Sequence, residues 1–290
     1  MMFSVQADNL KLLKEAVESN CDEVRFGPEF CEYKLPSLDE LEEAYMLSIH
    51  SNKVFTYVTP RISENILEKM RAQLQFLNEK KNSSVVINDF GVLNLIGQYP
   101  NLKPRLGRQL MYVPARCPWE EIKSRQTKHE TSFLSKRKVE KIFYQTSLNY
   151  LPTIRIYQGY GVQSIDVDFI QPCFPYFSYL AENGFNISIH LHLIPAAVTR
   201  RCHTARFLGE KSLEKCSRPC DTRAFLLERD LLDTKLVLYG NAVFKFTKYS
   251  EEEIKKILGN EFKEIVATMG PATSIENQEE INALKQMLQL

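Results

Sequence analysis

Short β-rich segments alternate with amphipathic helical patterns along this chain, and this alternation constrains its fold more than any other feature. The candidate strands cover residues 23–26, 54–58, 84–88, 105–110, 164–168, 186–192, 235–239 and 264–269. Most of them precede a helical pattern, as at 63–79 and 277–289. Alternating strands and helices indicate a parallel sheet. Eight units over ~250 residues favour a closed (β/α)8 TIM-like barrel, and an open doubly wound sheet is the alternative.

The composition is that of an ordinary globular protein. The 290 residues are 44% hydrophobic and 25% charged, which allows one α/β-barrel domain over 1–290. The net charge of +1 gives no overall attraction to nucleic acid or to an anionic membrane. No apolar run approaches the ~20 residues that span a bilayer, and the first residues do not resemble a signal peptide. We therefore expect a cytoplasmic protein without a membrane partner.

Two segments interrupt the strand–helix pattern. Residues 112–145 form a basic insertion with eight Lys or Arg residues against four acidic ones. This insertion is either a solvated helix face or a contact surface for a partner or RNA, because a local patch can bind phosphate without global charge. Residues 194–233 form a cysteine-rich loop after the sixth candidate strand. Both segments follow strands, where barrel enzymes carry functional loops.

Four of the seven cysteines suggest a bound metal or cluster. Cys202, Cys216 and Cys220 lie in one short stretch, and Cys31 follows the first candidate strand. In a barrel, Cys31 and the loop after the sixth strand share the C-terminal rim. Thiols stay reduced in the cytoplasm, and an odd cysteine count argues further against complete disulfide pairing. Four thiolates suit an iron–sulfur cluster or a zinc ion, and the plain alternative is a set of scattered buried cysteines.

The candidate catalytic residues are two histidines and one carboxylate. His190 and His192 alternate on the sixth candidate strand, so we expect both side chains on one face, where they could move protons. They could equally be hydrogen-bonded core residues. Asp168 ends the fifth candidate strand, where barrel catalytic groups gather, and shares a face with Asp166. A capping or structural role is the alternative for Asp168.

The candidate substrate-binding residues lie beside the cysteines or at strand ends. Arg206 belongs to a cationic rim that could hold a carboxylate, or it is simple surface charge. His203 is adjacent to Cys202 and could orient the loop or remain solvated. Gln109 and Asn241 lie near the ends of their predicted strands, where a loop-bonding role is the alternative to substrate binding.

The cysteine-rich stretch resembles a known family. The run RCHTAR at 201–206, followed by CSRPC at 216–220, looks like the cluster-binding region of the collagenase-like U32 peptidase family. Its layout is similar to that of the family's anaerobic ubiquinone-hydroxylation proteins, which have a further cysteine after the first strand, as Cys31 is here. Segments 88–95 and 105–110 also resemble family segments. The resemblance implies a barrel with a 4Fe-4S cluster on Cys31, Cys202, Cys216 and Cys220.

The resemblance also implies an activity. Members of the family hydroxylate an RNA base or a quinone-like small-molecule precursor without oxygen, and prephenate is the implied oxygen donor. We therefore expect an oxygen-independent hydroxylase, or a subunit of one in a heterodimer with a related longer family member. The alternatives are a peptidase or other hydrolase, after the family's historical label, and a non-catalytic cluster-bearing partner.

Overall fold

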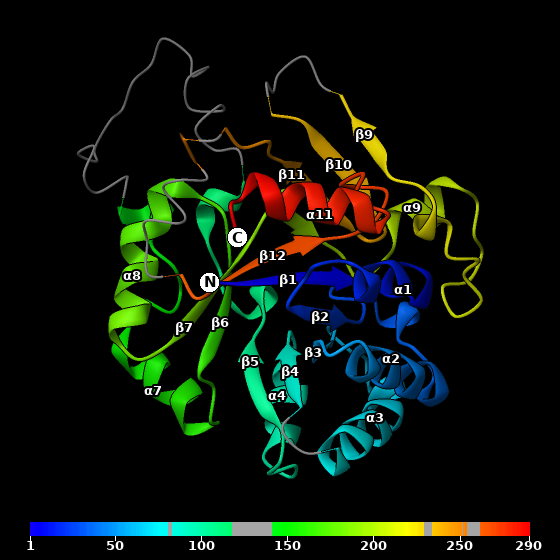
Figure 1. The fold of residues 1–290 in the computed structure, drawn as a ribbon, viewed down its shortest axis with the longest axis horizontal. Helices are drawn as coiled ribbons and strands as arrows, with labels where there is room; N and C mark the ends of the chain where they lie inside the picture. Colours follow the sequence, from blue (N-terminus) through cyan, green and yellow to red (C-terminus); the bar gives the residue numbers. More distant parts are fainter. Residues whose placement is uncertain (81–82, 118–140, 229–233, 251, 254–261) are drawn as a thin grey trace.

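A computed structural model describes residues 1–80, 83–117, 141–228, 234–250, 252–253 and 262–290. Eight parallel strands close into a barrel in the order β1-β12-β7-β6-β5-β4-β3-β2 (Figure 1). They cover Met2–Ala7 (β1), Glu23–Phe26 (β2), Val54–Val58 (β3), Ser84–Ile87 (β4), Lys103–Leu106 (β5), Ser164–Asp168 (β6), Asn186–His190 (β7) and Glu264–Thr268 (β12). The predicted (β/α)8 barrel is confirmed.

One barrel strand differs from the sequence prediction. The predicted segment 235–239 is not in the barrel, where β7 pairs directly with β12. The eighth strand is instead the N-terminal β1, which closes the barrel between β12 and β2. In β1, Phe3 and Val5 are fully buried in the hydrophobic core, whereas Ser4 and Gln6 hydrogen-bond to glutamates of the barrel interior. Alternate polar positions therefore interrupt the apolar run that marks most buried parallel strands.

Helices follow most barrel strands and cover the barrel. Their bounds are Leu10–Glu18 (α1), Leu38–His50 (α2), Leu67–Glu79 (α3), Phe90–Ile96 (α4), Leu151–Gly159 (α7), Phe174–Glu182 (α8), His203–Phe207 (α9) and Gln278–Met287 (α11). Helix α2 begins with a capping box, in which Ser37 and Glu40 hydrogen-bond reciprocally. Helix α1 is capped by Asn9, whose side chain accepts from the Leu12 amide.

Short 3-10 turns carry several residues of the C-terminal rim. They cover Glu32–Lys34 (η1), Glu64–Ile66 (η2), Arg108–Leu110 (η3), Pro114–Arg116 (η4), Gln171–Cys173 (η5) and Pro219–Asp221 (η6). Predicted strand 105–110 thus ends at Leu106, and its last residues form η3.

A second, antiparallel sheet covers the C-terminal mouth of the barrel. Its strands are Leu193–Val198 (β8), Phe225–Leu227 (β9), Leu236–Tyr239 (β10) and Ala242–Phe246 (β11), in the order β8-β11-β10-β9. The carbonyl of Leu193 accepts a hydrogen bond from Arg108, 2.7 Å away, just past the end of β5. The segment predicted as a barrel strand at 235–239 is therefore part of this second sheet, whose residues follow β7 and precede β12 in the sequence.

The barrel interior is unusually rich in charge. Arg25 contacts Glu23, Asp166 and Glu264, and Arg105 also contacts both glutamates. All five side chains are buried. Because an unpaired buried charge is costly, each guanidinium is placed among carboxylates that compensate it.

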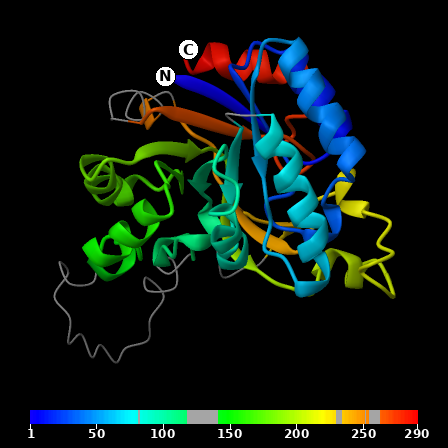
Figure 2. The ribbon, with the colours of Figure 1, turned by 90° about the horizontal axis from the view of Figure 1, so that it is seen from below.

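The two ends of the described chain lie close together in both views (Figures 1 and 2). Strand β1 is adjacent to β12, and α11 contacts the end of α1, where the Asn20 amide donates to Asn282, 2.8 Å away. In the described part of the chain, no helix is both long enough and apolar enough to cross a membrane.

Candidate functional site

The four cysteines come from two loops of the C-terminal rim. Cys31 follows β2 and precedes η1, whereas Cys202 precedes α9 and its Sγ accepts from the Ala205 amide, 3.4 Å away. Cys220 lies in η6, and Cys216 lies in the loop before it. The placement of Cys31 on the rim that carries the cysteine-rich loop is as predicted.

The four thiols are close enough to influence one another electrostatically. Burial raises the pKa of Cys31 to about 11, and Cys202 adds to the increase. Burial also raises the pKa of Cys202, with a further contribution from Cys216. Cys220 has its pKa raised to about 12 by burial, and Cys31 contributes to that increase as well. These pairwise effects link all four thiols, whose ionised forms would need a nearby cation.

The spacing of the thiols bears on what they could hold. Among the described residues, no three His, Cys, Asp or Glu side chains are grouped to hold one metal ion. A single zinc ion with four thiolates would bring the sulfur atoms within ~4 Å of one another. A four-iron cluster binds each thiolate through a different iron and so spaces them more widely. The described residues therefore form no single-ion site of this kind.

Gly240 lies next to Cys220. Gly240 has a φ of +59°, and a Cβ added there would lie 3.9 Å from the Cys220 sulfur. A larger side chain would occupy the room next to that thiol. The donor chemistry of the four thiols fits a cluster.

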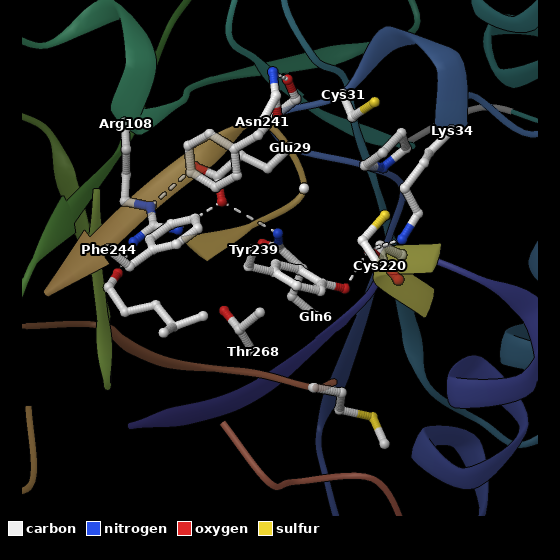
Figure 3. A pocket seen from close by; sticks show the side chains of 16 residues that line it. Gln6, Glu29, Cys31, Lys34, Arg108, Cys220, Tyr239, Asn241, Phe244 and Thr268 are labelled. Carbon is white, nitrogen blue, oxygen red and sulfur yellow. Dashed lines mark hydrogen bonds and ion pairs between the residues drawn. The ribbon is translucent and has the colours of Figure 1, made fainter. Parts of the chain in front are cut away.

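A small cavity of about 40 Å³ lies between two of the thiols and the barrel mouth. Cys31 and Cys220 line one side beside Lys34, and Arg108 lies across from them (Figure 3). Lys34 pairs with Asp8 and, 2.6 Å away, with Asp221. This lysine therefore brings a buried positive charge close to Cys220.

Two further cavities continue from the thiols along the rim. The first, of about 60 Å³, is lined by Cys31 and Cys202. The second is much larger, about 540 Å³, and reaches Arg116 and Cys117. The two share Arg61 and Gln109 in their walls. A molecule in the large cavity would thus lie next to the thiol-lined one.

Asn241 joins the two cysteine-bearing loops. Its side-chain amide donates to the carbonyls of Phe30 and Thr199, each 2.8 Å away. Phe30 directly precedes Cys31, and Thr199 lies three residues before Cys202. Its Oδ1 is buried without a hydrogen-bond partner among the described residues and borders two cavities. Asn241, predicted to bind substrate, therefore holds the two loops together through its side-chain amide, and its Oδ1 is an acceptor without a partner among the described residues.

Gln109 lies in the wall between the thiol-lined and the large cavity. Its side-chain amide donates to the carbonyl of Glu29, and its backbone amide donates to Asn88, 3.1 Å away. Its Oε1 is buried and has no partner in the described part of the chain. This position is compatible with the predicted role in substrate binding.

Asp168 anchors two arginines at the barrel mouth. Its carboxylate accepts from Arg108 at 2.8 Å and from Arg116 at 2.6 Å, and Arg108 also pairs with Glu29 at 2.6 Å. Burial alone would raise the pKa of Asp168, but Arg116 and Arg108 outweigh it and lower the pKa. Asp168 is therefore ionised near neutral pH and positions the arginines rather than donating a proton.

His190 and His192 do not share a face as predicted. His190 points into the barrel, where Nε2 lies 3.1 Å from Asp166. His192 has a φ of +67°, outside β7, and its ring stacks on Phe246 with centroids 6.0 Å apart. The left-handed backbone at His192 turns its side chain toward the second sheet. The prediction failed because β7 ends at His190.

His190 is held as a neutral imidazole. Burial and then Arg108 lower its pKa, although Asp166 opposes them. Asp166 has its pKa lowered by Arg25 and His190 against the effect of burial, so its carboxylate only accepts. Nε2 of His190 must then carry the proton, which leaves Nδ1 buried without a partner among the described side chains.

His203 and Arg206 lie away from these cavities. Both are exposed residues of α9, and neither lines the two thiol-bordering cavities or the large one among the described residues. The cationic character expected of Arg206 is instead supplied inside the site by Arg61, Arg116 and Arg200. Sequence reasoning missed Lys34 and Arg116; their position shortly after strand ends was the available signal.

The basic insertion predicted over 112–145 falls largely on residues 118–140, outside the described residues. Of its described residues, Tyr112, Val113, Arg116 and Cys117 line the large cavity. The predicted cysteine-rich loop over 194–233 contains β8, α9, η6 and β9, and its residues 229–233 also lie outside the described part.

Comparisons with known proteins give likenesses of structure. No protein-family model and no curated protein sequence matches the chain. A thiamine phosphate pyrophosphorylase from Pyrococcus furiosus is 7% identical with a TM-score of 0.46, covering 99% of this chain and 94% of that one. A U32 peptidase is 11% identical with a TM-score of 0.44, covering 93% of each chain. Dihydropteroate synthase from Xanthomonas albilineans is 11% identical with a TM-score of 0.43, covering 99% and 92%. At these values the likenesses carry no assignment of activity.

Proposed function

We propose that Cys31, Cys202, Cys216 and Cys220 hold a 4Fe-4S cluster at the barrel mouth. The observation that carries this proposal is that Cys31 lines one cavity with Cys220 and a second cavity with Cys202, so thiols from two distant parts of the chain meet at one rim. Cys216 lies four residues before Cys220 in the same loop. The donor chemistry of four thiols supports it. When bound, such a cluster would supply one-electron redox chemistry.

The protein itself would then be an oxygen-independent hydroxylase or a subunit of one, similar to the ubiquinone-hydroxylation members of the U32 family. Its substrate would be an RNA base or a quinone-like small molecule, with prephenate as oxygen donor. Gln109 and the arginines of the large cavity would bind and orient that substrate, and Asn241 would hold the two cysteine loops together. We place the protein in the cytoplasm, in a heterodimer with a longer relative.

Anaerobic purification and reconstitution test the cluster. We expect visible absorbance with about four irons and four sulfides per chain in the wild type. Cys202→Ala and Cys216→Ala should lose both, whereas Cys21→Ala should keep them, because Cys21 is buried against the Ala16 carbonyl outside the cysteine loops. A colourless protein that contains zinc, or equal iron in all variants, would refute the cluster.

Mass spectrometry tests the reaction. RNA nucleosides and quinone intermediates from a deletion strain should lack one hydroxyl group, and wild-type protein but not Cys202→Ala should restore it. Complete hydroxylation in the deletion strain would contradict the proposed activity.

A further inference from the structure

We propose that the large cavity binds a small molecule with a flat ring that carries an anionic group, either a carboxylate or a phosphate. The inference names the kind of molecule that the proposed activity would use, and to that extent it rests on the proposed function. It depends on the arginines and aromatic rings of the cavity, and not on the thiols.

Positive charge in the cavity wall is not fully compensated. Arg61 and Arg200 both line the cavity and have no ion-pair partner among the described residues, and Arg61 donates to the backbone carbonyl of Gln109, 2.9 Å away. Asp89 is the acidic residue in the wall, and its carboxylate caps α4 by accepting from the amides of Gly91 at 2.6 Å and Val92 at 3.2 Å. Two arginines against one carboxylate leave one positive charge, which an anionic ligand would balance.

Arg116 adds a fixed donor to this wall. Its Nε donates to Asp168 at 2.6 Å and its Nη1 donates to the carbonyl of Met111 at 2.6 Å. Its Nη2 is buried and has no hydrogen-bond partner among the described residues. A guanidinium held at two points with one nitrogen unsatisfied is pre-organised for a charge-assisted hydrogen bond. Buried nitrogens of this kind otherwise cost stability.

Two aromatic rings at the same cavity are left uncovered by the rest of the described chain. Phe90 is 65% exposed and Tyr112 is 67% exposed, and both line the cavity. Large exposed rings gathered at a concave site mark a binding surface. Rings beside guanidinium groups suit a ligand with a flat face and an anionic edge, since the ring can stack while the anion is paired.

Titration with benzoate and, separately, with uridine 5′-monophosphate tests this inference by calorimetry. We expect at least one of them to bind, and acetate to bind more weakly because it has no ring. Benzoate alone would indicate an aromatic carboxylate, and the nucleotide alone would indicate a phosphate-bearing base. Binding of acetate as tight as that of the ring compounds, or of none of the three, would overturn the proposal.

Variants assign the binding to the cavity. Arg200→Met and Arg61→Met remove exposed side chains, so the fold is not at risk, and each should weaken binding about tenfold. Tyr112→Ala should weaken it about threefold through the lost ring contact. Arg155→Met and Tyr179→Ala, at exposed or half-exposed helix positions, are the matched controls and should bind like the wild type. Wild-type affinity in both cavity arginine variants would refute the site.

Cysteine variants separate this inference from the proposed function. Cys202→Ala and Cys216→Ala should keep the affinity for the ring compound, because the arginines and not the thiols hold it. Loss of iron with unchanged binding supports the anion site independently of hydroxylation. Unchanged iron in those variants together with unchanged binding would refute the cluster and leave the anion site standing.

Discussion

Glu23 and Glu264 lie side by side inside the barrel and contact the same hydroxyl group, that of Ser4. A hydroxyl donates only one proton, so one of the two carboxyl groups must itself carry a proton when both contacts are satisfied. Burial raises the pKa of Glu264 to about 7. Against the effect of burial, Arg105 and Arg25 lower the pKa of Glu23. The shared proton therefore belongs mainly to Glu264, and the two groups titrate as a pair.

This proton predicts a dependence of stability on pH. The pKa of Glu264 is raised from 4.5 to about 7 on folding, so its contribution is complete below pH 4.5 and is lost as the pH rises through 7. The loss is on the order of 3 kcal/mol. The side chain in Glu264→Gln is neutral at every pH. In urea unfolding, the free energy of unfolding of this variant relative to the wild type should therefore increase between about pH 5 and about pH 8.

The exposed Glu279→Gln is the control for that measurement, since it changes the same group outside the barrel. Titration of His190 affects both proteins and cancels in the difference. If the difference in unfolding free energy between the wild type and Glu264→Gln is the same at about pH 5 and at about pH 8, the assignment of the proton to Glu264 is wrong.

A glycine at the end of β2 should tolerate no side chain. Gly27 has a φ of +132°, and a Cβ there would lie 2.2 Å from the carbonyl oxygen of Val58. Gly27→Ala should cost at least about 3 kcal/mol of unfolding free energy, or prevent folding. Gly159→Ala is the matched control, because nothing lies within 4 Å of its added Cβ. We expect that control to unfold at or above the wild-type denaturant concentration; equal loss in both variants would contradict the steric argument.

The tether between the cysteine loops should affect both stability and thiol access. Asn241→Ala removes two hydrogen bonds to the carbonyls of Phe30 and Thr199 and should cost about 2 kcal/mol. Alkylation followed by mass spectrometry should show faster labelling of Cys31 and Cys202. Asn94→Ala, at an exposed position of α4, should leave both measurements unchanged. Unaltered labelling rates in Asn241→Ala would show that the loops are held by other contacts.

The arginine anchor at the mouth should be structural. Asp168→Asn leaves Arg108 with Glu29 alone and Arg116 without a carboxylate, and should destabilise the fold by about 3 kcal/mol. Combining it with Arg116→Met should cost less than the sum of the two single changes, because both remove the same ion pair. Additive costs in denaturant unfolding would indicate that the pair contributes little. The exposed Asp39→Asn serves as the surface control.

The sequence was sufficient for the barrel and for the shared rim of the cysteines. Both follow from alternation of strands and helices, since the loops after parallel strands meet at one end of a barrel. Strand β1 escaped prediction because Ser4 and Gln6 face charged partners inside the barrel, so its pattern lacks a continuous apolar run. The strand at 236–239 has such a run but pairs antiparallel in the second sheet.

The detailed site depended on contacts that no local pattern contains. Arg116 is held by Asp168, fifty-two residues further along the chain. His192 leaves the face of His190 because of one left-handed residue after the strand end. Arg206 has the charge expected of a binding residue, but its helix exposes it away from the cavities. The sequence shows which residue types are present, but it does not show the direction in which each side chain points.

The order of strands around the barrel has a consequence for how the protein is made. The shorter path around the barrel from β2, which precedes Cys31, to β7, which precedes Cys202, runs through β1 and β12. Strand β12 is the last barrel strand to leave the ribosome. A nascent chain therefore carries all four thiols well before the rim that gathers them is complete. If the four thiols hold the proposed cluster, iron and sulfide would be bound only after the barrel is finished, and the cluster content of the protein would measure completed synthesis.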